Sequence, residues 1–159
     1  MNLKETREKY ELTQLEVAQF LGVPVRTYAR YERDDSYGDR LKREMMIKTI
    51  TDQYELTEEK GLLTVSKISE ILNRLFNEKY KGQIGYCYLF GSYAKGYAKD
   101  NSDVDLCIST VLTGLNFVGL IEDIRNELHK KIDLIRIDTL KDNIELINEI
   151  MKEGIKIYG

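Results

Sequence analysis

The sequence predicts an α+β protein in which an all-helical N-terminal domain precedes a domain that combines strands with helices. In residues 2–56 the apolar side chains recur at helical spacing in several short runs, and no segment has the pattern of a strand. Beyond residue 66, three short apolar runs at 84–90, 104–108 and 132–137 predict buried strands. The pattern changes near residues 55–62, so we expect domains at 1–58 and 59–159.

The composition narrows the class of protein. With 42% hydrophobic and 32% charged residues among 159, the chain can bury one or two small cores. No apolar run approaches the roughly 20 residues that span a bilayer, and the first residues are largely polar, so we expect a cytoplasmic protein without a membrane partner. The net charge of −3 argues against a basic surface over the whole protein, although Arg26, Arg30 and Arg33 concentrate positive charge locally.

The cysteine and histidine content limits the kinds of metal, redox and catalytic site that the chain can form. Cys87 and Cys107 lie in strand-like runs without CxxC spacing, so we expect buried free thiols. His129 is the only histidine, which excludes a histidine cluster for zinc within one chain. We expect it at the C-terminal end of a helix, where partial positive charge is favourable.

The N-terminal domain contains the pattern of two helices joined by a tight turn. Thr13 and Glu16 have the spacing of a capping box, which predicts that a helix starts there and ends near Gly22. Gly22 permits a left-handed backbone, and the φ angle of Pro24 suits the start of the next helix. This succession predicts a helix-turn-helix.

The run ELTQLEVAQFLGVPVRTYARYER resembles the phage-repressor helix-turn-helix family of the Cro and lambda-repressor type, whose usual run is LTQ.ELA..LGVS..TIS.YE. The resemblance covers about residues 3–55, with Pro24 in place of the usual serine or threonine cap. It implies an operator-binding protein that forms a two-fold homodimer and inserts residues 24–33 into the major groove. Expected base contacts are Val25, Arg26 and Arg30, and expected phosphate contacts are Thr27 and Arg33. The alternative is a module that mediates only protein contact or dimerisation.

The second domain has a regular succession of predicted elements. Apolar residues from Val65 to Phe76 mark one face of a long helix, and Gly82 follows its end. After the first two strands, an amphipathic helix is predicted at 116–130, before the third strand. A helix near 143–153 and a short strand at 155–158 complete the domain.

The end of the first strand has the sequence of an anion site. Phe90 is followed by Gly91, Ser92 and the start of a short helix, which leaves backbone N–H groups unpaired. Gly91 allows close approach of a phosphate oxygen, and the Ser92 hydroxyl can donate one more hydrogen bond. Glycine-serine turns are common, so this signal alone is weak.

Three aspartates strengthen the interpretation. Asp103 and Asp105 are two residues apart at the start of a strand, so both carboxylates project from the same face. Their repulsion raises a pKa unless a cation lies between them, and magnesium commonly joins one or two carboxylates to substrate phosphates. Asp133, in the third strand, offers a further carboxylate. The set predicts phosphoryl or nucleotidyl transfer with two magnesium ions roughly 3.5 to 4 Å apart.

The segments Gly91 to Gly96 and Ser102 to Leu106 resemble the minimal nucleotidyltransferase (MNT) family of the polymerase-beta-like superfamily, whose pattern is GSxAxGxxxxxSDxDL. The similarity extends over roughly residues 64–159. It implies a small mixed sheet flanked by helices, with Gly91 and Ser92 on the ATP triphosphate. Asp103 and Asp105 are implied to bind magnesium, and Asp133 to complete the metal site and to act as, or beside, the base. The alternative is a degenerate fold without turnover.

The resemblance also implies a biological role. Many stand-alone MNT proteins resemble antitoxins that pair with HEPN-domain ribonuclease toxins and transfer AMP from ATP to a toxin tyrosine. Our first hypothesis is therefore an antitoxin-like nucleotidyltransferase that also binds operator DNA. A second is a transcription regulator whose C-terminal domain only binds nucleotide. A third is a transferase that modifies an RNA end or a small antibiotic.

Overall fold

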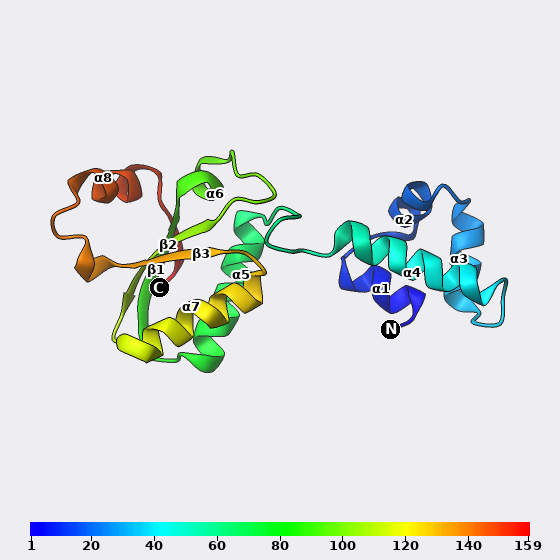
Figure 1. Ribbon diagram of the computed structural model, residues 1–159, viewed down its shortest axis with the longest axis horizontal. Helices are drawn as coiled ribbons and strands as arrows, with labels where there is room; N and C mark the ends of the chain where they lie inside the picture. The colour runs from blue at the N-terminus through cyan, green and yellow to red at the C-terminus, as the bar shows by residue number, and fades with distance from the viewer. The chain divides into compact units, whose positions relative to one another are not determined.

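The computed structural model describes residues 1–159 and divides the chain into two compact units, Met1–Glu55 and Leu56–Gly159. The first unit is entirely helical, and the second contains a four-stranded sheet with helices (Figure 1). The predicted α+β class is confirmed. None of the helices is long and apolar enough to cross a bilayer.

The N-terminal unit consists of four helices around one small core. They are α1 (Leu3–Lys9), α2 (Gln14–Leu21), α3 (Val25–Arg33) and α4 (Arg40–Tyr54). Each contributes apolar side chains because its hydrophobic positions recur once per turn. The buried core residues are Leu3, Val17, Ala18, Tyr28, Tyr31, Met46 and Ile50.

The two ends of α2 and the start of α3 have the predicted capping residues. Thr13 and Glu16 form the capping box, with the Thr13 N–H donating to the Glu16 carboxylate at 2.7 Å. Gly22 ends α2 in the left-handed conformation, with φ of 66°. Pro24 precedes α3 without a side-chain cap, so the start of α3 depends on the fixed φ of proline.

A partly buried ion pair joins the helices of this unit. Arg7 of α1 donates to both oxygens of Glu32 of α3, at 2.6 and 3.2 Å, and Gln14 of α2 donates to Glu32 at 2.9 Å. Burial alone raises the pKa of Glu32, but the hydrogen bonds from Arg7 and Gln14 outweigh it and leave the pKa below its ordinary value. The glutamate therefore stays ionised and fixes α3 against α1 and α2.

The C-terminal unit is a mixed sheet between two helical layers. Its sheet order is β3-β2-β1-β4, in which β1 is antiparallel to β2 and β4, and β2 is parallel to β3. The elements are α5 (Val65–Lys79), β1 (Ile84–Phe90), α6 (Gly91–Lys95), β2 (Val104–Thr110), α7 (Gly114–Leu128), β3 (Ile132–Arg136), the 3-10 turn η1 (Ile137–Thr139), α8 (Ile144–Glu153) and β4 (Ile155–Tyr158).

The two faces of the sheet pack against different helices (Figure 1). Leu106 of β2 lies in the core cluster that includes α5 and α7, whereas its neighbour Cys107 packs with residues of α8. Leu134 and Ile135 of β3 alternate in the same way. This period of two assigns every other residue of β2 and β3 to the face that α8 covers.

The predicted elements differ from the observed ones mainly at their ends. The second strand extends to Thr110 rather than 108, the helix predicted at 116–130 spans Gly114–Leu128, and Ile137 belongs to η1 rather than to β3. Cys87 and Cys107 are buried free thiols, as expected. His129 caps the C-terminal end of α7 with φ of 53°, which confirms its predicted position.

Candidate active site

Three carboxylates lie on the sheet face that α8 covers. Asp105 and Asp133 are directly paired in the parallel register of β2 and β3. Asp103 precedes β2 by one residue and shares the face of Asp105 because the two are separated by two positions. Asp103 and Asp133 are exposed, whereas Asp105 is partly buried. The two strands thus bring together aspartates that are 28 to 30 residues apart in the sequence.

The surroundings of Asp105 disfavour its charge. Burial, followed by the negative charges of Asp133, Asp103 and Glu149, raises the pKa of Asp105 to about 6. Neighbouring carboxylates can raise a pKa through space only where they are close and weakly screened. A cation among these side chains removes both the repulsion and part of the desolvation cost.

Gly91 directly adjoins the Asp105 carboxylate. It follows Phe90, which pairs with Asp105 across β1 and β2, and opens α6 with φ of 68°. A Cβ atom at this position would lie 2.1 Å from Oδ2 of Asp105, so only glycine fits. The predicted phosphate-binding turn and the predicted metal-binding carboxylate are therefore in contact distance, with Ser92 next along α6.

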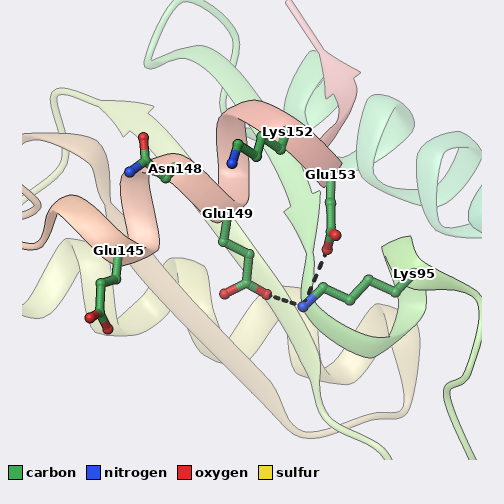
Figure 2. A pocket seen from close by; sticks show the side chains of 6 residues that line it. All are labelled: Lys95, Glu145, Asn148, Glu149, Lys152 and Glu153. Atoms are coloured by element: carbon green, nitrogen blue, oxygen red, sulfur yellow. Dashed lines mark ion pairs between the residues drawn. The ribbon is translucent and has the colours of Figure 1, made fainter.

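Glu149 is a charged residue that acts on Asp105 and that no motif in the sequence indicates. An open pocket of about 410 Å³ lies between α6 and α8, lined by Lys95, Glu145, Asn148, Glu149, Lys152 and Glu153. Lys95 points toward α8, where its Nζ pairs with Glu149 at 2.7 Å and with Glu153 at 3.3 Å (Figure 2). The charge of Glu149 also contributes to the raised pKa of Asp105, so Glu149 links this pocket electrostatically to that carboxylate.

The donor set of the aspartates fits magnesium that is shared with a substrate. No group of three or more histidine, cysteine or acidic side chains is close enough to form a protein-only metal cage. Magnesium prefers oxygen ligands, keeps several waters and is commonly held by one or two carboxylates together with substrate phosphates. The carboxylates of Asp103, Asp105 and Asp133 meet that requirement beside Gly91.

In the N-terminal unit, the residues predicted to contact DNA share an exposed surface of α3. Arg26, Arg30 and Arg33 are exposed and recur at helical spacing, while Tyr28 and Tyr31 on the opposite side are buried. Val25 is 37% exposed, and Thr27 is partly exposed. The guanidinium of Arg30 lies 4.4 Å from the centre of the Tyr37 ring, a cation–π contact that restrains the Arg30 side chain.

The fold is that of a nucleotidyltransferase domain preceded by a helix-turn-helix domain. A family model described as polymerase beta, nucleotidyltransferase matches residues 66–159, more than half of the chain. The chain belongs to this nucleotidyltransferase family. A helix-turn-helix model matches residues 3–37. Both resemblances inferred from the sequence motifs are confirmed.

The chain is similar to several known proteins. A Methanocaldococcus jannaschii protein named a "putative protein adenylyltransferase" is 37% identical over 75 residues, which form 45% of this chain and 87% of that protein. A solved toxin-antitoxin structure with AMP-PNP is 22% identical, with a TM-score of 0.49, over 57% of this chain and 73% of that chain. A structure of a tri-AMPylated Shewanella oneidensis HEPN toxin in complex with an MNT antitoxin is 18% identical, with a TM-score of 0.44, over 58% and 70%.

The charge of Glu149 is expected to contribute to the raised pKa of Asp105. Glu149→Gln removes that charge, so the pKa of Asp105 should fall from about 6 toward its ordinary value of 3.8. Carboxyl carbon NMR during a pH titration measures the change, and Glu145→Gln, in the same pocket, is the control. Equal titration curves for both variants contradict the expectation.

The raised pKa of Asp105 also makes the stability of the fold depend on pH. The folded chain holds the Asp105 proton more tightly than the unfolded chain does, so the stability linked to this group is fully present below pH 3.8. That contribution is lost as the pH rises to about 6. Glu149→Gln should make the loss smaller and move its end to lower pH.

Proposed function

We propose that the C-terminal unit transfers AMP from ATP to a hydroxyl group of a partner protein, with magnesium, and that the N-terminal unit binds operator DNA. The observation that carries the proposal is the contact between Gly91 and Asp105, together with the direct pairing of Asp105 and Asp133. Membership of the nucleotidyltransferase family supports the reaction class, and the relative named a protein adenylyltransferase supports the acceptor class.

Each site residue has a role in this proposal. The backbone N–H groups of Gly91 and Ser92 bind the triphosphate, and Asp103 and Asp105 hold magnesium beside it. Two magnesium ions held by these aspartates would supply positive charge that stabilises the departing pyrophosphate. Asp133 accepts the proton of the attacking hydroxyl. The acceptor oxygen forms a bond to the α-phosphorus as the bond from that phosphorus to the bridging oxygen of pyrophosphate breaks.

The proposed acceptor is a tyrosine of a HEPN-type ribonuclease toxin. This partner follows from the resemblance to MNT antitoxins and suits a chain that also carries a helix-turn-helix, because such a chain can both neutralise a toxin and repress its own operon. The exposed position of Asp133 at the proposed site is compatible with a macromolecular acceptor.

The experiment is transfer of label from α-labelled ATP, with magnesium, to a HEPN-domain ribonuclease, taken from the neighbouring reading frame where one is encoded there. The expected product is toxin that carries AMP on tyrosine, identified by mass spectrometry of its peptides. Nucleotide binding without transfer to protein, RNA or small hydroxyl compounds contradicts the proposal and favours a nucleotide-sensing regulator. Label on an RNA end or on an antibiotic favours the third hypothesis.

Operator binding is expected to depend on Arg30. If its guanidinium donates to a guanine edge, Arg30→Ala should weaken operator binding by about 1 to 3 kcal/mol. Fluorescence anisotropy with the promoter DNA of the operon measures the loss. Lys48→Ala is the charge-matched control because Lys48 is exposed on α4 rather than on α3. Equal losses in both variants indicate a general effect of charge and remove Arg30 from the base-reading set.

The bound form is expected to be a homodimer. Repressors with this motif place two recognition helices on half-sites about 34 Å apart, so one helix-turn-helix covers half of an operator. Sedimentation at the concentrations used for binding tests this, and a monomer on DNA contradicts it.

A further inference from the structure

Lys130 is a fully buried lysine that the proposed reaction does not use. Its side chain has 0% relative exposure, the lowest of any lysine in the chain. The Nζ ammonium donates to three backbone carbonyls, those of Thr57 at 2.6 Å, Lys60 at 3.2 Å and Asp100 at 2.5 Å. An ammonium has three N–H donors, so all of them are used.

The three carbonyls belong to two separate segments. Thr57 and Lys60 form a turn at the start of the C-terminal unit, in which the Thr57 N–H donates to the Lys60 carbonyl at 2.9 Å. Asp100 lies in the loop that connects α6 to β2. Lys130 therefore connects the turn at 57–60 to the loop 96–103, which lies between the two halves of the nucleotidyltransferase motif.

The position of Lys130 in the chain relates this contact to the aspartates. Asp100 precedes Asp103 by three residues, and Lys130 precedes Asp133 by three residues. Between them, the Val104 N–H donates to the carbonyl of Lys131 at 2.9 Å, the first hydrogen bond of the β2–β3 pair. The Lys130 ammonium and the Val104–Lys131 hydrogen bond therefore both connect the end of the α6–β2 loop to the start of β3, next to the three aspartates.

A structural role alone does not require a charged group here. Burying the Lys130 ammonium costs free energy of desolvation and lowers its pKa; the negative charges of Asp100, Glu59 and Glu58 offset only part of this cost, and none of them forms an ion pair with Lys130. A methionine, which is one heavy atom shorter and neutral, fills most of the same space without that cost. What the ammonium adds is three directed hydrogen bonds that hold backbone carbonyls of two irregular segments in one place.

We propose that Lys130 is a positioning residue for nucleotidyl transfer, which holds the loop 96–103 so that Asp103 faces Asp105 and Asp133. The inference rests on the proposed function of these aspartates. It assigns Lys130 no contact with substrate. Removing its ammonium should leave the sheet intact but release the loop, and magnesium should then bind more weakly.

The test compares wild-type protein with Lys130→Met, and uses Lys131→Met as the matched control because Lys131 is the exposed neighbour. Hydrogen exchange followed by mass spectrometry should show faster exchange in peptides that cover 96–103 and 56–61, with the peptide of β1 unchanged. Binding of Mn²⁺, measured by electron paramagnetic resonance, should weaken by about tenfold or more, the usual effect of losing a group that orients metal ligands. The magnesium concentration for half-maximal AMP transfer should rise by the same factor.

The outcomes separate this inference from the proposed function. If wild-type protein transfers no AMP, the proposed function fails, and the exchange and Mn²⁺ measurements still decide the role of Lys130. If Lys130→Met folds and shows wild-type loop exchange and Mn²⁺ affinity, the inference is wrong. If Lys130→Met does not fold, Lys130→Gln replaces it, because its shorter neutral side chain cannot reach all three carbonyls. Loop exchange and Mn²⁺ affinity of Lys130→Gln then test the inference.

Discussion

Asp105→Asn is expected to reduce AMP transfer by about 10³-fold, the size of effect that follows loss of a preorganised electrostatic group at a reacting centre. Asp105 is the carboxylate that adjoins Gly91 and is paired with Asp133, so its charge acts on both the proposed phosphate turn and the proposed metal site. An asparagine has nearly the same shape but cannot neutralise a bound cation. The measurement is the initial rate of labelled AMP transfer at saturating ATP and magnesium.

The same variant should be at least as stable as wild-type protein at pH 7. Its carboxylate is partly buried beside other negative charges, and the raised pKa of about 6 means that ionisation opposes folding. Thermal unfolding followed by circular dichroism measures this, with Asp35→Asn, an exposed aspartate of the N-terminal unit, as control. A variant that is both inactive and strongly destabilised means that the loss of activity reports misfolding and does not support the assignment.

Gly91→Ala is expected to reduce AMP transfer by at least about 10²-fold, because a 1 Å displacement of a positioned group has effects of this order. The new Cβ would lie 2.1 Å from Oδ2 of Asp105, which is far inside contact distance, so either the carboxylate or the start of α6 must move. Either movement separates the N–H groups proposed to bind phosphate from the carboxylate proposed to bind metal. The rate of AMP transfer and the KM for ATP measure the effect.

Gly96→Ala is a close control for this prediction. Gly96 ends α6 with φ of 83°, but a Cβ added there meets nothing within 4 Å. It therefore carries the strain of a left-handed alanine without the collision. If both variants lose activity equally, backbone strain in α6 explains the loss, and the contact between Gly91 and Asp105 does not have the proposed role.

The local sequence was sufficient to predict most elements of the fold. The capping box at Thr13, the left-handed turn at Gly22 and the period of the apolar residues depend on neighbours within a few positions, and each of them is present as predicted. The ends of elements were less well predicted, since the extension of β2 to Thr110 depends on pairing with β1 rather than on the pattern of β2 itself.

The candidate site was likewise predicted only where it depends on residues that are close in sequence. That Asp103 and Asp105 share a face follows from their spacing in one strand, and the repulsion that raises a pKa was expected from that spacing. The charge of Glu149 was not expected, because it lies on a helix 44 residues further along that carries no recognisable motif. Buried Lys130 was not expected either, because in sequence it reads as one of two ordinary lysines before a strand.

By itself, the sequence determined the family of the chain, the order of its helices and strands and the identity of the acidic and glycine residues, because these depend on residue type and short spacing. Only the tertiary structure decided that Asp133 pairs with Asp105, that Gly91 leaves room for the Asp105 carboxylate and that Lys130 joins two distant segments. Strand register and close packing arise from contacts between residues far apart in the chain, and no local pattern specifies those contacts.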